Sequence, residues 1–117
     1  MKIYNPFLTF NMKELIVAYM ILNNKTEISI DEIYNFSLSL DKKMKKEKIL
    51  GSILYSNVYL IEFKQENSED FYVGENYISL KKGHSIEWLI KNYTPYMSLD
   101  KLEILGLIDL KNINSTL

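Results

Sequence analysis

The sequence predicts a single α+β domain in which helices are followed by a β-hairpin and then by further helices. Three observations support this fold class. The length of 117 residues is that of one ordinary domain. Apolar residues recur at helical spacing through the first half of the chain. Between residues 58 and 80 the pattern changes to short β-rich runs around a polar turn.

The first helix is predicted from its capping signal. Residues 2–10 are expected to form a short strand or an extended arm. Asn11 then offers a side-chain acceptor at an N-cap, and Glu14 follows three residues later, which is the capping-box arrangement. The helix is expected to run to Leu22 and to be central to the core, because its apolar stripe is wide. The stripe comprises Met12, Leu15, Ile16, Tyr19 and Leu22, widened by Val17, Met20 and Ile21.

Two further helices are predicted before the hairpin. Residues 27–30 are compatible with a short strand, and Ser29 with Glu32 repeats the capping signature, so a second helix is expected to end near Leu38. After a brief turn, Asp41 can cap a third helix that reaches about Ser56. Its buried stripe is predicted to be Ile49, Leu50, Ile53 and Leu54.

The remaining elements follow from the change of period. Residues 58–64 are predicted to be a strand, residues 65–70 a polar turn, and residues 71–80 a returning strand with a bulge at Gly74. A helix is expected to open at residues 83–85 and to stop at Pro95, with Trp88 as its core anchor. Residues 98–106 are predicted to form a last short helix, followed at 107–110 by a strand or a docking tail.

Over residues 11–82 this order and spacing of elements resembles the winged helix-turn-helix superfamily. The resemblance implies a three-helix core, with residues 42–56 in the place of the recognition helix and residues 58–80 as the β-hairpin wing. Residues 83–117 would then be a C-terminal helical extension within the same domain, which spans 1–117. This extension is a candidate dimerisation segment, because residues 98–110 are rich in leucine and isoleucine.

The lysines of the third predicted helix are the main functional signal. Between Asp41 and Ser56, five lysines against two acids give a net charge of +3, whereas the whole chain carries −1. Lysine, serine and tyrosine side chains all contact DNA phosphates. The expected contacts are a stripe opposite the buried side of the helix and flanking lysines. The stripe is Lys45, Lys48, Ser52 and Tyr55, and the flanking residues are Lys42, Lys43 and Lys46.

The predicted hairpin carries the opposite charge. From Glu62 to Glu75 there are five acids against Lys64, a net charge of −4. A wing that enters a DNA groove would normally be basic. The alternatives are that these acids keep an edge strand soluble, that the helix binds DNA without the wing, or that the hairpin binds a basic protein.

Several function classes find little support. There is no cysteine, and His84 is the only histidine, so zinc sites and histidine-based catalytic pairs are not expected. The four glycines are too scattered for a phosphate-binding loop. We expect no enzyme activity, no metal and no cofactor. The chain shows no apolar run long enough for a membrane span and no signal-peptide pattern, so a cytoplasmic location is expected.

The sequence therefore predicts a small winged-helix DNA-binding protein. It would act as a regulator, or as an accessory factor of a mobile element such as a plasmid or phage. Its partner would be double-stranded DNA, bound as a homodimer. Arginine is absent, so planar bidentate recognition of guanine is not available and contacts to phosphate would dominate. The alternative is a protein-interaction module or inhibitor that uses the acidic hairpin.

Overall fold

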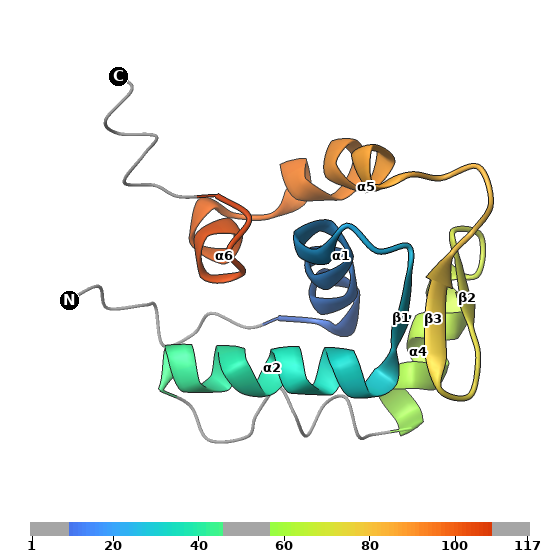
Figure 1. Cartoon of the computed structure of the whole chain (residues 1–117), viewed down its shortest axis with the longest axis horizontal. Helices are drawn as coiled ribbons and strands as arrows, with labels where there is room; N and C mark the ends of the chain where they lie inside the picture. The colour runs from blue at the N-terminus through green and yellow to red at the C-terminus, as the bar shows by residue number, and fades with distance from the viewer. Residues whose placement is uncertain (1–9, 46–56, 109–117) are drawn as a thin grey trace.

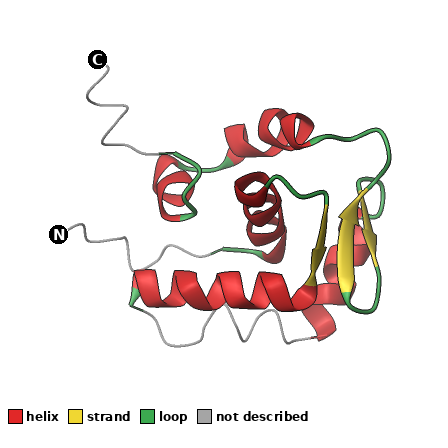
Figure 2. Ribbon diagram, viewed as in Figure 1, coloured by secondary structure: helices red, strands yellow, loops and turns green. Residues whose placement is uncertain are grey.

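The computed structural model describes residues 10–45 and 57–108, and these form a mixed α+β arrangement (Figures 1 and 2). This part of the chain holds five α-helices, one 3-10 helix and a three-stranded antiparallel sheet. The elements in chain order are α1 (Met12–Asn23), β1 (Glu27–Ser29), α2 (Ile30–Met44), α4 (Asn57–Asn67), β2 (Phe71–Val73), β3 (Tyr77–Leu80), α5 (Ile86–Tyr93), η1 (Thr94–Tyr96) and α6 (Leu99–Ile104).

Helix α1 is the centre of the core, as its sequence predicts. It lies between α2 and α5 and also packs against α4 (Figure 1). The predicted capping box is present: the Asn11 side chain accepts from the Glu14 amide at 2.8 Å, and the Glu14 carboxylate accepts from the Asn11 amide at 3.0 Å. Four consecutive residues, 15–18, are buried. A helix that is apolar on nearly all sides needs neighbours on all sides, and α1 has them.

The sheet joins strand β1, which follows the first helix, to the hairpin. Strand β1 pairs with β3, and β3 pairs with β2, all antiparallel, so the order is β1-β3-β2. Ile28 lies opposite Ile78, and both are buried against the helices. On the other face of the hairpin Tyr72 and Tyr77 are exposed. This alternation is that of a sheet with one face on the core and one toward solvent.

The end of helix α2 differs from the one that the sequence predicts. It does not end near Leu38 but continues to Met44, so Asp41 lies inside its last turn and does not cap a third helix. Ser37 and Ser39 suggest a break, yet their hydroxyls donate to the carbonyls of Tyr34 and Phe36 three residues earlier, which keeps them within the helix. Burial of Leu40 extends the apolar face past the serines.

Helix α4 stands where the sequence predicts a strand, so this prediction is wrong. Residues 58–64 were expected to form a strand but lie in a helix. Their β-branched and aromatic residues favour a strand, but burial has the period of a helix: Phe63 and Asn67 are buried four residues apart, and Lys64, Gln65 and Glu66 between them are exposed. The Asn67 side chain also donates to the Phe63 carbonyl at 3.0 Å. Packing of α4 against α1 and β2 outweighs the intrinsic preference of its β-branched and aromatic residues for a strand.

The hairpin is consequently shorter than predicted. It comprises only β2 and β3, joined by a turn at residues 74–76 and not interrupted by a bulge at Gly74. The turn is closed by the Gly74 amide, which donates to the Tyr77 carbonyl at 2.8 Å. A side chain at position 74 would meet the Tyr77 ring, with Cδ1 only 2.8 Å from the added carbon. Glycine at this position lets the ring lie across the turn.

The C-terminal helices close over the core. Ser85 and Ser98 cap α5 and α6, close to the predicted starts of both helices. Lys101 of α6 forms an ion pair with Glu14 of α1 at 2.9 Å. Ile104 and Leu105 are buried. The predictions for residues 2–9, for the helix stripe at 49–54 and for residues 109–110 fall outside the part of the chain that the structure describes.

Candidate functional site

Three of the seven predicted DNA contacts lie in the described part of the chain, and they cluster at the end of α2. Lys42 and Lys43 belong to its last turn, and Lys45 is its C-cap. All three residues are exposed. The Lys43 ammonium donates to the Ile104 carbonyl at the end of α6, at 3.0 Å, so it also holds two helices together. The other predicted contacts, Lys46, Lys48, Ser52 and Tyr55, lie outside the described residues.

Lys42, Lys43 and Lys45 do not belong to a third helix that begins at Asp41, although the sequence predicts one there. Lys45 has a left-handed backbone, with φ 59° and ψ 34°, which ends α2 before the rest of the lysine run begins. The helix that directly precedes the hairpin is α4, and its described exposed charges are Glu62, Lys64 and Glu66. A helix of 15 residues is about 22 Å long, and the sheet lies at the opposite end of α2 from the lysines (Figure 1). The basic and acidic regions are therefore separate surfaces.

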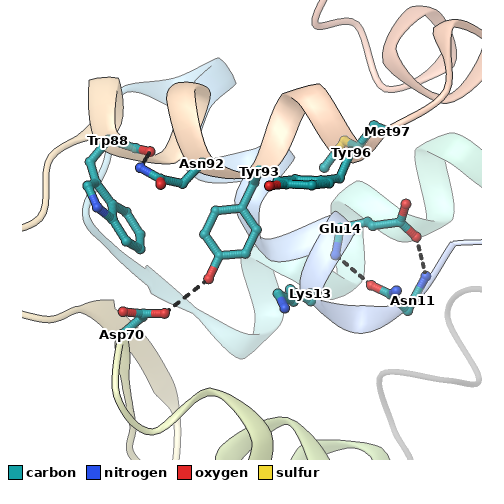
Figure 3. A pocket seen from close by; sticks show the side chains of 9 residues that line it. All are labelled: Asn11, Lys13, Glu14, Asp70, Trp88, Asn92, Tyr93, Tyr96 and Met97. Atoms are coloured by element: carbon teal, nitrogen blue, oxygen red, sulfur yellow. Dashed lines mark hydrogen bonds between the residues drawn. The ribbon is translucent and has the colours of Figure 1, made fainter.

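A second candidate site lies between α1, α5 and η1. It is a pocket of about 450 Å³, a volume within the range of small-ligand sites. Aromatic side chains and Met97 form one wall, and polar side chains of α1 and Asp70 face them (Figure 3). The lining residues are Asn11, Lys13, Glu14, Asp70, Trp88, Asn92, Tyr93, Tyr96 and Met97.

Asp70 holds one side of this pocket in place. It lies in the turn between α4 and β2, where its amide donates to the Asn67 carbonyl. One carboxylate oxygen is 3.0 Å from His84 Nε2, and the other accepts from the Tyr93 hydroxyl at 3.3 Å. The His84 ring stacks on Trp88 with centroids 3.8 Å apart. This cluster ties the hairpin to α5.

Tyr93 is the most perturbed titratable group of the pocket. Burial of its ring and the neighbouring Asp70 carboxylate raise the pKa of Tyr93 to about 12, because both disfavour the phenolate. Its ring also contacts Phe71 and Trp88 edge-on. At neutral pH the Tyr93 hydroxyl therefore stays protonated and donates its hydrogen bond to Asp70.

The charged groups of the pocket differ in how well the protein satisfies them. Glu14 accepts from Lys101 and from the amide of Asn11. The Asp70 carboxylate contacts His84 Nε2 and accepts a hydrogen bond from the Tyr93 hydroxyl. Lys13, in contrast, forms no ion pair within the described residues; its ammonium lies 5.1 Å from the centre of the Tyr93 ring. A second pocket of about 270 Å³ shares Asn11 and Lys13 and continues toward α4.

Sequence reasoning missed this pocket. Trp88 packs against the core as predicted, but it also lines the pocket, and the His84 ring stacks on it. Asp70 was counted only as part of an acidic turn. The single available signal was the group of aromatic residues between positions 88 and 96, which a helix followed by a 3-10 turn gathers on one side.

No family model, no curated protein and no solved structure matches this chain. The residues that the structure describes contain no helix long and apolar enough to cross a membrane. They also contain no group of three or more histidine, cysteine, aspartate or glutamate side chains placed to hold a metal ion.

Proposed function

We propose that the chain is a winged-helix DNA-binding protein that grips the phosphate backbone through the lysines at and beyond the end of α2. The described order of helix, strand, helix, helix and hairpin supports the proposal, with β1 paired to β3 of the hairpin. The bounds differ from those that the resemblance implies: the helix before the hairpin is α4 and not residues 42–56, and the hairpin spans residues 71–80 and not 58–80. A regulator, or an accessory factor of a mobile element, is the role proposed for it.

The observation that carries the proposal is the group of exposed lysines, Lys42, Lys43 and Lys45, in a chain whose net charge is −1. Such a local excess of positive charge attracts a polyanion even when the whole molecule is acidic. Lys46 and Lys48 follow directly in the sequence and are proposed to extend the same surface, with Ser52 and Tyr55 as further contacts. Helix α4 is not proposed as a DNA contact, because its exposed acids would repel phosphate.

The proposal is tested by the salt dependence of binding to a fluorescein-labelled, AT-rich duplex, followed by anisotropy. Each phosphate neutralised contributes about −0.9 to the slope of log K against log salt. Exchanging Lys42 and Lys45 for glutamine should therefore flatten the slope by about 1.8. Lys43 is left intact because it also anchors α6.

The matched control is the double exchange Lys64→Gln and Lys91→Gln, which removes the same charge from exposed positions on α4 and α5. Its slope should equal that of the wild-type protein. An equal flattening in the control, or no wild-type binding at about 50 mM salt, would contradict the proposal.

A second candidate function is supported by the opposite end of the molecule. Glu62, Glu66, Glu69 and Glu75 are exposed along α4 and the hairpin, beside the exposed rings of Tyr72 and Tyr77. Aromatic residues are frequent at the centres of protein interfaces. This surface would suit a basic protein partner, so the chain could act as an interaction module or inhibitor. Comparing the duplex affinity of a Lys42→Gln, Lys45→Gln variant with that of a Glu66→Gln, Glu69→Gln variant separates the two functions.

A further inference from the structure

We propose that the pocket between α1, α5 and η1 binds a small aromatic carboxylate. The inference goes beyond DNA binding and does not depend on it, because the pocket is lined by none of the lysines proposed to contact DNA.

The walls of the pocket suit a flat ring. Trp88, Tyr93 and Tyr96 present aromatic rings, and Met97 adds a polarisable thioether (Figure 3). Tyr96 is 87% exposed, so its ring costs little to reorient over a ligand. Aromatic rings pair in offset or edge-on geometries, and the edge-on contact of Trp88 with Tyr93, centroids 5.7 Å apart, forms a fixed corner against which such a ring can pack.

The polar side of the pocket selects the charge of the ligand. Lys101 offsets the charge of Glu14 at 2.9 Å, and the Asp70 carboxylate is held by contacts with His84 Nε2 at 3.0 Å and the Tyr93 hydroxyl at 3.3 Å. Lys13 is the lining cation, no described ion pair offsets its charge, and its ammonium lies 5.1 Å from the centre of the Tyr93 ring. A carboxylate bound to Lys13 would form the charge-assisted hydrogen bonds that the fold itself does not supply.

A second donor lies beside Lys13. The Asn11 side chain accepts from the Glu14 amide through its carbonyl oxygen, which leaves its amide nitrogen free to donate toward the pocket. A carboxylate has two oxygens, so Lys13 and Asn11 can bind one each. Glu62 and Glu66 border the adjoining pocket on the far side of Lys13, and as exposed groups they weaken the attraction for an anion without cancelling it.

Trp88 supplies the readout, because it is the only tryptophan of the chain and lines the pocket. The experiment titrates 3-phenylpropionate into the full-length protein and follows Trp88 fluorescence, with calorimetry as an independent signal. The matched probes are 3-phenylpropylamine, which has the same ring and a positive charge, and propionate, which has no ring. We expect saturable binding of 3-phenylpropionate and binding of each matched probe at least tenfold weaker.

Variants then test the assigned groups. Lys13→Gln should weaken binding of 3-phenylpropionate at least tenfold, Lys13→Arg should retain it, and Lys91→Gln, on α5 but outside the pocket, should leave it unchanged. Glu66→Gln should tighten binding slightly. An unchanged thermal transition of Lys13→Gln shows that the loss is not unfolding. The proposal is overturned if the amine binds as tightly as the carboxylate, if Lys13→Gln binds normally, or if 3-phenylpropionate does not saturate at millimolar concentration.

Discussion

Individual residues in this protein act mainly by joining elements that are distant in sequence. Glu32 illustrates this role. As the third residue of α2 it accepts from the Ser29 amide at 2.7 Å, and it also forms an ion pair with Lys25 at 2.8 Å. The hydrogen bond from Lys25, followed by that from the Ser29 backbone, lowers the pKa of Glu32 to about 2. The start of α2 is thereby coupled to the loop after α1.

This lowered pKa predicts how stability changes with pH. An acid whose folded pKa is depressed stabilises the folded state above its ordinary pKa, and the contribution is lost as pH falls through the folded value. We therefore expect Glu32→Gln to lower the Tm at pH 7, and the difference from wild type to shrink as pH falls from about 4.5 to about 2. Calorimetric melting across this range measures it, with the exposed Glu27→Gln as control. A difference independent of pH would contradict the assignment.

The raised pKa of Tyr93 predicts the opposite change of stability with pH, at alkaline pH. Its raised pKa of about 12 stabilises the folded state below pH 10, and this contribution is lost as pH rises toward 12. Because the Asp70 carboxylate contributes to the shift, Asp70→Asn should lower the pKa of Tyr93. NMR titration of tyrosine ring carbons, assigned with Tyr93→Phe, measures both values. Finding Tyr93 at an ordinary pKa near 10 in the wild-type protein would contradict the burial and contacts described for it.

At the scale of elements, the capping boxes and the strands at residues 27–29, 71–73 and 77–80 agree with the sequence, whereas the end of α2 and the strand expected at 58–64 do not. Asn11 and Ser29 cap helices as expected, because a cap depends only on residues within one turn, whereas Asp41 lies inside α2 and caps no helix. The end of α2 depends on the burial of Leu40, and the helical state of α4 depends on the contacts of Phe63 with distant elements. The pocket was unpredictable for the same reason: Asp70 and Tyr93 meet only in the fold.

The end of α2 offers a test that separates stability from binding. Lys45 has a left-handed backbone, which costs a residue with a side chain roughly 1–2 kcal/mol but suits glycine. We expect Lys45→Gly to raise the free energy of unfolding by about 1 kcal/mol while weakening DNA binding. Urea denaturation and anisotropy measure the two effects. A destabilised variant would show that α2 does not end at this residue.

At the scale of the whole molecule, the C-terminal extension partly covers its own core and partly remains exposed. Ile104 and Leu105 are buried, but Leu99 of α6 is 61% exposed and Ile90 of α5 is 44% exposed. We propose that this exposed part of α5 and α6 forms the interface of a homodimer. Two copies would double the number of phosphates contacted, which is how small DNA-binding modules commonly gain affinity.

The dimer is tested by sedimentation. Wild-type protein should sediment as a dimer at micromolar concentration, and Leu99→Asp should sediment as a monomer, because a charge in an apolar interface is costly. Ile61→Asp is the control, since Ile61 is also exposed but lies on α4. A monomeric wild-type protein would contradict this interface.

The proposed DNA binding rests on the separation of charge between the two ends of α2. The lysines lie at one end, and the acids of α4 and the hairpin lie at the other. The most direct measurement compares duplex affinity at about 50 mM salt for two double variants, Lys42→Gln with Lys45→Gln and Glu66→Gln with Glu69→Gln. DNA binding predicts weaker binding for the lysine variant and unchanged or tighter binding for the glutamate variant. A lysine variant that binds DNA as tightly as the wild-type protein would contradict DNA binding through the end of α2.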